Sequence, residues 1–142
     1  MTIREIQEEI ISDFAVMGNW EDKYEYIIQL GKELPLISEA YKTDDNLIKG
    51  CQSRVWLHTE LKDGKLFFSG DSDAVITKGL VSLMIHVLSG HTPQDIASAD
   101  IYFIDAIGLR SHLSPTRSNG LLSMLKQMKL YAVAYQAKIN QS

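Results

Sequence analysis

Cysteine is almost absent from this chain: among its 142 residues there is one, Cys51. A lone thiol cannot close an intramolecular disulfide, and it cannot by itself provide a metal site built from several thiolates. Any chemistry at Cys51 therefore uses a single sulfur atom, either as a nucleophile or as the carrier of a group attached to sulfur.

Long apolar runs and concentrated positive charge are also missing. No stretch is long enough to span a bilayer, and the first residues lack the charged-then-apolar order of a signal peptide. The net charge is -4 and the basic residues are scattered, which argues against nucleic-acid binding. With one unpaired cysteine, these features predict a cytoplasmic protein with no nucleic-acid or membrane partner. The length fits one domain over residues 1–142.

The residues around Cys51 are polar or small. Lys49, Gly50, Gln52 and Ser53 flank it, and glycine lets the backbone turn sharply and lets another molecule come close. This context predicts an exposed bend. The alternative is a packing role, because unpaired cysteine is among the residue types most often buried as a small hydrophobe.

Apolar residues at helical spacing predict several helices. Thr2 with Glu5 forms a capping-box pattern, and Asn19 is placed to cap the second helix. Asp71 or Asp73 is predicted to cap the third. The predicted helices cover residues 3–16, 20–34, 74–88 and 93–98, with a long final helix from about 118. A short link at 101–104 and a loop at 108–117 lie between the last two.

Alternating apolar and polar residues predict two strands, at 54–61 and 65–70, joined by the hairpin signal Asp63-Gly64. Residues 47–48 add a possible short third strand. A bare hairpin is marginal in water and needs helices against it. The predicted fold is therefore α+β, with helices packed on one face of a small antiparallel sheet.

Histidines and acidic residues raise the question of a metal site. The histidines are His58, His86, His91 and His112. None belongs to an HxxxH or HExxH pattern and there is no CxxC, so we predict no metal site. The run 71–73 suggests either a hard-cation site or, more simply, a strand exit followed by a helix cap.

A thiol hydrolase built on Cys51, His112 and an aspartate is a second possibility. It needs a nucleophile, an adjacent base and an orienting group, but no residue pattern marks His112 as the base. Arg117 near Cys51 would favour the thiolate. The simpler expectation for the 112–120 segment is a cap at Thr116 or Ser118 that starts the last helix.

Motifs in a fixed order along nearly the whole chain carry a resemblance to a known family. They are Trp20, Tyr24, Leu30-Gly31-Lys32-Glu33-Leu34-Pro35, Asn46, Gly50-Cys51-Gln52-Ser53, Val55-Trp56, Asp71-Ser72-Asp73-Ala74, Lys78-Gly79-Leu80, Gly90-His91-Thr92-Pro93, Leu109, His112-Leu113-Ser114-Pro115, Arg117 and Asn119-Gly120-Leu121. In these motifs the chain resembles the SufE family of sulfur acceptors, whose fold is similar to that of the cluster scaffold IscU.

The resemblance implies a function and a site. A cysteine desulfurase holds sulfur as a persulfide, and the acceptor, by match Cys51, takes it over and stimulates the enzyme. Pyridoxal phosphate would belong to the desulfurase, and no cofactor is expected here. The sulfur would pass to an iron–sulfur scaffold or another acceptor. The matched residues expected to support Cys51 are Gly50, Gln52, Asp71, Asp73, His112 and Arg117.

Some alternatives stay open at this stage. The same carrier chemistry would serve tRNA thiolation or another sulfur pathway, and the chain could act as a monomer or a homodimer. A scaffold would need several iron ligands, so one cysteine favours a carrier. Lys49 and Arg54 flank the cysteine segment, and we expect their charge to help hold the thiolate.

Overall fold

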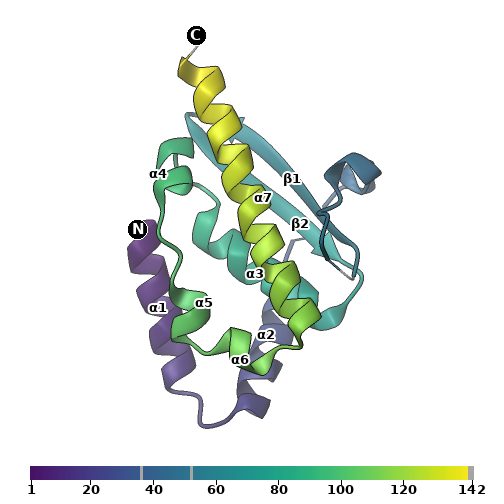
Figure 1. Cartoon of the computed structure of the whole chain (residues 1–142), viewed down its shortest axis with the longest axis vertical. Coiled ribbons are helices and arrows are strands. Elements are labelled where there is room, and N and C mark those ends of the chain that lie inside the picture. The colour runs from purple at the N-terminus through teal and green to yellow at the C-terminus, as the bar shows by residue number, and fades with distance from the viewer. Residues whose placement is uncertain (36, 52, 141–142) are drawn as a thin grey trace.

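The computed structural model describes residues 1–35, 37–51 and 53–140, and it confirms the predicted α+β class (Figure 1). Its described strands form one antiparallel hairpin, β1 (Val55–Lys62) and β2 (Lys65–Ser72). Both turn residues, Asp63 and Gly64, have positive φ, as the Asp-Gly signal predicts. The predicted third strand at 47–48 is wrong, because only an isolated bridge joins Leu47 to Trp56.

The two faces of the hairpin differ in what covers them. Val55, Leu57, Leu66 and Phe68 are buried on the inner face, against which α3 (Val75–Leu88) packs. The outer face is not bare: the ring of Tyr41 stacks on His58 with centroids 3.6 Å apart. The predicted packing of helices on one face therefore holds for the long elements, while a short 3-10 turn covers part of the other face.

The remaining helices surround α3. Figure 1 shows the longest one crossing the front of the molecule with α3 behind it. They are α1 (Ile3–Ala15), α2 (Trp20–Glu33), α4 (Pro93–Ser98), α5 (Phe103–Ala106), α6 (Leu109–His112) and α7 (Pro115–Asn140), with 3-10 turns η1 (Glu39–Tyr41) and η2 (Asp44–Asn46).

Side-chain caps explain several helix starts. The Thr2–Glu5 capping box is present, and the Asn19 side chain accepts a hydrogen bond from Asp22 N, so both predictions are confirmed. The predicted cap of the third helix is wrong. Ala74 occupies the N-cap position of α3 without a side-chain bond, because both candidate aspartates are engaged elsewhere.

The segment from 101 to 118 is more helical than predicted. Its predicted link contains the start of α5, and its predicted loop contains α6 and the first turn of α7. α7 starts at Pro115 rather than near 118, with the Ser114 side chain accepting a hydrogen bond from Arg117 N at 3.3 Å. Proline at a first helical position needs no N–H partner, and the apolar periodicity becomes visible only further along.

α2 and α3 cross at two glycines. A Cβ built on Gly79 would lie 2.1 Å from the carbonyl oxygen of Ile27, and one on Gly31 would lie 2.8 Å from Gly79 N. No side chain fits at this crossing. The crossing brings α2 against the buried α3, and α3 in turn packs on the hairpin that follows the Cys51 loop in the chain.

We predict that Gly79→Ala lowers the free energy of unfolding by about 3 kcal/mol, because the added methyl group overlaps rigid backbone. Urea denaturation followed by circular dichroism measures this. Gly18→Ala is the matched control: a Cβ at Gly18 meets no atom within 4 Å, so its effect should stay within about 0.5 kcal/mol. Equal stabilities of the two variants would show that the crossing is not tight.

Candidate functional site

Cys51 lies on a short loop whose two ends are tied together. Ile48 N donates to Val55 O at 2.9 Å, which closes the loop at its base. At its tip Gly50 is exposed and has φ +91°, a conformation that favours glycine. The predicted exposed bend is therefore present at Gly50, while Cys51, whose own exposure the sequence did not determine, is half-buried.

The loop rests on α7 through two glycines. Cys51 Sγ donates to the carbonyl oxygen of Gly120 at 3.5 Å, and a Cβ on Gly120 would stand 3.4 Å from that sulfur. A Cβ on Gly50 would stand 2.6 Å from Ser123 Oγ. The absence of a side chain at Gly50 lets the loop lie close to Ser123 of the helix, and the sulfur is turned inward onto the Gly120 carbonyl.

A cavity of about 100 Å³ opens beside the sulfur. Its walls come from the Cys51 loop, the start of α3 and the first turns of α7. The apolar part of its lining consists of Ala74, Ile76, Leu80, Leu121 and Met124. The polar part includes Arg117, so Arg117 lies at the same cavity as Cys51.

Burial raises the pKa of the Cys51 thiol, since a thiolate loses solvation in this position. The bond to the Gly120 carbonyl also requires the proton to stay on sulfur. The expectation that Lys49 and Arg54 hold a thiolate is therefore wrong for this conformation: the two side chains are exposed and the thiol is turned away from solvent. In this conformation, Cys51 is a protected thiol.

Asp73 fixes the base of the loop. Its Oδ1 accepts a hydrogen bond from Arg54 N at 3.0 Å, and its own N–H donates to Arg54 O at 3.3 Å. Ser72 Oγ also donates to Arg54 O, at 2.8 Å. Asp73, one of the residues predicted to support Cys51, therefore holds the end of the loop by hydrogen bonds to the backbone of Arg54.

Asp71 lies elsewhere, on the outer face of the hairpin. Its carboxylate binds Lys42 Nζ at 2.9 Å and Lys78 Nζ at 3.3 Å. Burial alone would raise the pKa of Asp71, but the two ammonium groups and the N–H of Ser72 together lower it. Asp71 is not among the described residues that line the Cys51 cavity. Its ion pairs with Lys42 and Lys78 join the segment before the loop to α3.

His112 is not placed to act as a base for Cys51. Its ring stacks on Trp20 with centroids 3.8 Å apart, its Nδ1 lies 3.0 Å from Gly108 O, and its carbonyl accepts the hydroxyl of Tyr24. It is also not among the described residues that line the cavity. The thiol-hydrolase arrangement of Cys51 with His112 is therefore not formed. Gln52, also predicted to support Cys51, lies outside the described residues.

Sequence reasoning did not place Gly120 at the sulfur, although the Gly120 carbonyl accepts the hydrogen bond from Cys51 Sγ. The only signal was weak, since an isolated glycine inside a helical pattern is tolerated at a cost and does not by itself say what packs against it. It also missed Lys42 as the partner of Asp71 and Trp20 as the partner of His112. Those pairs join segments far apart in the chain, and neither the spacing nor the periodicity of the sequence indicates them.

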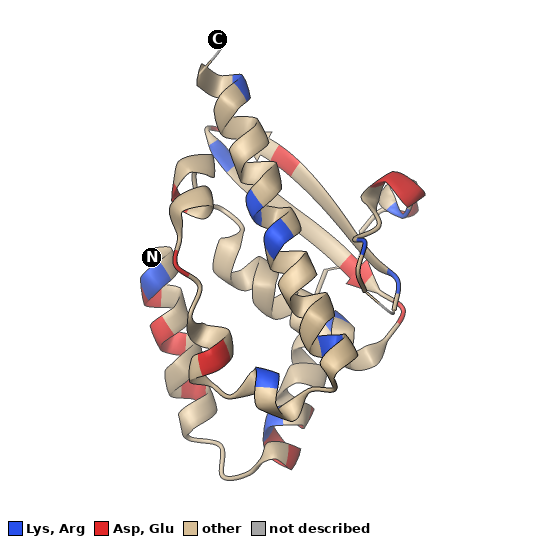
Figure 2. Cartoon of the chain, viewed as in Figure 1, with Lys and Arg blue, Asp and Glu red and all other residues tan. Residues whose placement is uncertain are grey.

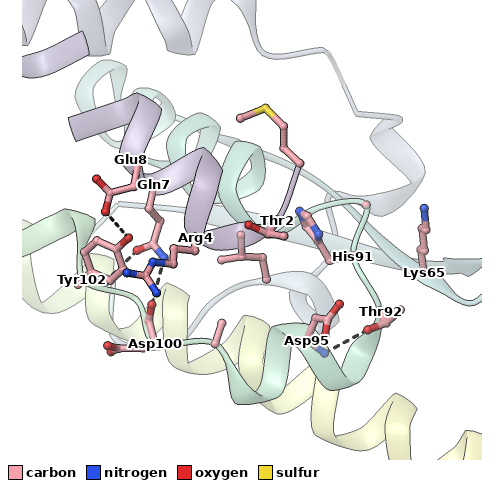
Figure 3. Close-up of a pocket in the computed structure, with 14 residues that line it drawn as sticks. Thr2, Arg4, Gln7, Glu8, Lys65, His91, Thr92, Asp95, Asp100 and Tyr102 are labelled. Carbon is pink, nitrogen blue, oxygen red and sulfur yellow. Dashed lines mark hydrogen bonds between the residues drawn. The ribbon is translucent and has the colours of Figure 1, made fainter. Parts of the chain in front are cut away.

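A larger hollow, about 850 Å³, lies at the start of α1 (Figure 3). Its polar groups largely bind one another. Gln7 Nε2 donates to Asp100 O at 3.0 Å, and the Tyr102 hydroxyl donates to Glu8 Oε1 at 2.7 Å. The hollow has no cysteine in its lining. The smaller cavity at Cys51 is therefore the better candidate for chemistry.

The described residues contain no group of three or more histidine, cysteine, aspartate or glutamate side chains arranged to hold a metal ion. Over the same residues, no helix is both long and apolar enough to cross a bilayer.

Comparison with known proteins places the chain in a family. The model of the SufE domain, described as a domain associated with Fe-S metabolism, matches residues 8–132. The chain belongs to the SufE family. Uncharacterized SufE-like proteins of Rhizobium meliloti and Rhizobium etli are 43% and 42% identical to it over 127 residues, which cover 86% of this chain and 91% and 86% of theirs.

The fold of this SufE-family chain also matches a solved structure. The solution structure of a hypothetical protein from Thermus thermophilus superimposes with a TM-score of 0.77, over 93% of this chain and 96% of that one. The two sequences are 16% identical, so the match concerns the fold alone.

We predict that Cys51 in the folded protein reacts with iodoacetamide at neutral pH several times more slowly than in the urea-unfolded chain, because burial disfavours the thiolate. Since Cys51 is the only cysteine, mass spectrometry reads this one site. Because the thiol pKa is higher in the folded than in the unfolded chain, the free energy of unfolding falls as pH rises through that pKa, and Cys51→Ala should remove this fall. Equal alkylation rates in both states would contradict the inward position of the thiol.

Proposed function

We propose that this SufE-family chain accepts sulfur on Cys51 from the persulfide of a cysteine desulfurase and passes it on for iron–sulfur cluster assembly. The observation that carries the proposal is the position of the sole cysteine: one thiol on a glycine-led loop, turned into a small, mostly apolar cavity. The family's association with Fe-S metabolism supports the destination of the sulfur.

The proposed transfer is a displacement at sulfur. The Cys51 thiolate attacks the outer sulfur of the desulfurase persulfide, and a new bond forms between Cys51 Sγ and that sulfur. The bond between the enzyme's own cysteine and the outer sulfur breaks, and its electron pair leaves with the enzyme as a thiolate. No external oxidant or reductant is needed, because one sulfur–sulfur bond replaces another.

In this proposal the inward position is a resting state. A protonated, half-buried thiol resists oxidation but is a poor nucleophile. Docking of the partner would have to break the bond between Cys51 and Gly120 O and bring the sulfur out. The loop is suited to such a change, because its tip contacts α7 through glycine backbone rather than through interlocked side chains.

The cavity also offers room for the product. Its volume of about 100 Å³ is several times the roughly 10–15 Å³ that a water-sized particle requires, so one added sulfur atom fits. A lining of Ile76, Leu80, Leu121 and Met124 would keep water from the persulfide. Returning the loaded Cys51 to this cavity would protect the sulfur until the next acceptor binds.

This chain would not by itself release sulfur from free cysteine. In our proposal the carbon–sulfur bond of free cysteine is broken by the desulfurase with its own pyridoxal phosphate, and this chain serves as acceptor and activator. A single thiol suits this role, because a second one nearby would attack the persulfide and release sulfide.

We predict that incubation with a cysteine desulfurase and cysteine adds the mass of one sulfur atom to the wild-type chain, and that Cys51→Ser abolishes the addition. Sulfide production by the desulfurase should rise with wild type only, because Cys51→Ser cannot clear the enzyme's persulfide. Equal stimulation by wild type and Cys51→Ser would refute the proposal.

The matched control moves the thiol. Val16 is 85% exposed at the end of α1, so Val16→Cys combined with Cys51→Ser keeps one cysteine in the chain but outside the cavity. This variant should gain no sulfur from the desulfurase. If it is loaded as fast as wild type, accessibility alone explains acceptance and the cavity has no part in it.

We further predict that His112→Ala retains sulfur acceptance while lowering the free energy of unfolding by about 1 kcal/mol, because it removes the stack on Trp20. Mass spectrometry of the adduct and thermal denaturation measure the two effects separately. A stable His112→Ala protein that accepts no sulfur would instead indicate that His112 takes part in the chemistry.

A further inference from the structure

The loop that carries the thiol is attached on both sides to three consecutive residues at the end of β2. Where the chain leaves the loop, Ser72 Oγ donates to Arg54 O at 2.8 Å, and Asp73 Oδ1 accepts from Arg54 N at 3.0 Å. Where the chain approaches the loop, Asp71 binds Lys42 at 2.9 Å. Figure 2 shows red at the end of β2, and both red and blue in the short helical segment beside the hairpin.

The segment that enters the loop, residues 39–48, is held together by its own hydrogen bonds. We call it the entry segment. Asn46 Nδ2 donates to Tyr41 O at 2.7 Å, and Leu47 N donates to Asp44 O at 3.2 Å. Because these bonds join its first turn to its last residues, a displacement of one part reaches the other.

Three contacts hold the entry segment on the hairpin. They are the stack of Tyr41 on His58, the bridge between Leu47 and Trp56, and the ion pair of Lys42 with Asp71. The bond from Ile48 N to Val55 O then closes the loop. One hydrogen bond fixes a distance and only loosely an angle, so the contacts before Ile48 set the direction in which the chain enters the loop.

The ion pair between Lys42 and Asp71 can open without leaving a buried charge alone. Asp71 keeps Lys78 Nζ at 3.3 Å and the N–H of Ser72 at 2.8 Å, and Lys42 keeps Glu39 Oε1 at 3.1 Å. The Lys42 side chain is 21% exposed and that of Asp71 is 9% exposed, so the lysine is the partner that reaches solvent. Salt and competing carboxylates weaken a pair in this position.

We propose that Lys42 and Asp71 are positioning residues of the Cys51 loop: their ion pair fixes the entry segment on the hairpin and so keeps the sulfur turned onto the Gly120 carbonyl. When Lys42 leaves Asp71, the entry segment loosens and the thiol turns outward more often. The effect on the loop follows from the contacts above. Its consequence for sulfur acceptance rests on the proposed function, in which the outward thiol attacks the persulfide.

Lys42→Met tests the proposal, because it removes the ammonium group and keeps a side chain of similar length. We expect iodoacetamide to alkylate Cys51 in this variant about fivefold faster than in wild type, which is the upper end of what one partly exposed ion pair contributes. Loss of a cation by itself disfavours the thiolate, so a direct effect of charge on the thiol would slow the reaction instead. Hydrogen exchange should become faster in the entry segment and stay unchanged in α3 and α7.

Two companion measurements separate the ion pair from the packing of the side chain. Lys42→Arg keeps the charge and should be alkylated at close to the wild-type rate. Added salt should speed the alkylation of wild type and change that of Lys42→Met much less. Lys32→Met is the matched control, because it removes an exposed charge on α2; it should react as wild type does.

The consequence for sulfur acceptance is measured with a desulfurase that the wild-type chain stimulates. Lys42→Met should reach half-maximal stimulation at an about fivefold lower concentration, with the maximal rate unchanged. The reason is that the apparent affinity of a partner for a minor form scales with the population of that form.

Wild-type alkylation and exchange in Lys42→Met would overturn the inference. Faster exchange throughout α3 and α7 would overturn it as well, because it would show general destabilisation. Faster alkylation with an unchanged half-maximal concentration would refute the consequence for sulfur acceptance. If wild type stimulates no desulfurase, the proposed function fails with that consequence, and the alkylation rates alone decide whether the pair holds the loop.

Discussion

The site depends on the direct contact between the Cys51 loop and α7. Glycine is needed on the loop side, where Gly50 has a positive φ and its Cβ would meet Ser123 Oγ at 2.6 Å, whereas a Cβ at Gly120 would be in ordinary van der Waals contact with the sulfur. The cavity walls, the inward direction of the thiol and its raised pKa follow from this contact. A side chain at Gly50 would have to adopt a positive φ, which L-residues rarely do, and would displace the Ser123 hydroxyl.

Protection and reactivity make opposite demands on one sulfur atom. Apolar surroundings keep the thiol protonated and slow to oxidise, whereas attack on a persulfide needs a thiolate with access to the outer sulfur. In the proposed function, a contact that opens when the partner docks would reconcile these demands, whereas a fixed cationic neighbour would not. A cation beside the sulfur would favour the thiolate at all times, including when no partner is present.

The fold was largely predictable because it is governed by local signals: the Thr2 and Asn19 caps, the Asp63-Gly64 turn, and apolar residues at regular spacing. Cys51 was predictable as the candidate for sulfur chemistry because it is the only thiol in the chain. Its burial was not, since the covering residues come from α3 and α7, far along the chain. His112 was misplaced for the same reason, because its partner Trp20 lies on α2.

The ties at both ends of the Cys51 loop also set a mechanical limit. Ile48 is bonded to Val55, and Arg54 is held by Asp73 and Ser72, so only the residues between them would be released if the sulfur turned outward as proposed. An extended chain advances about 3.4 Å per residue, so the segment 49–53, held at both ends, reaches outward by roughly 10 Å at most. In the proposed transfer the Cys51 sulfur could therefore not travel to a distant donor, and the donor would have to approach to within that distance of the loop.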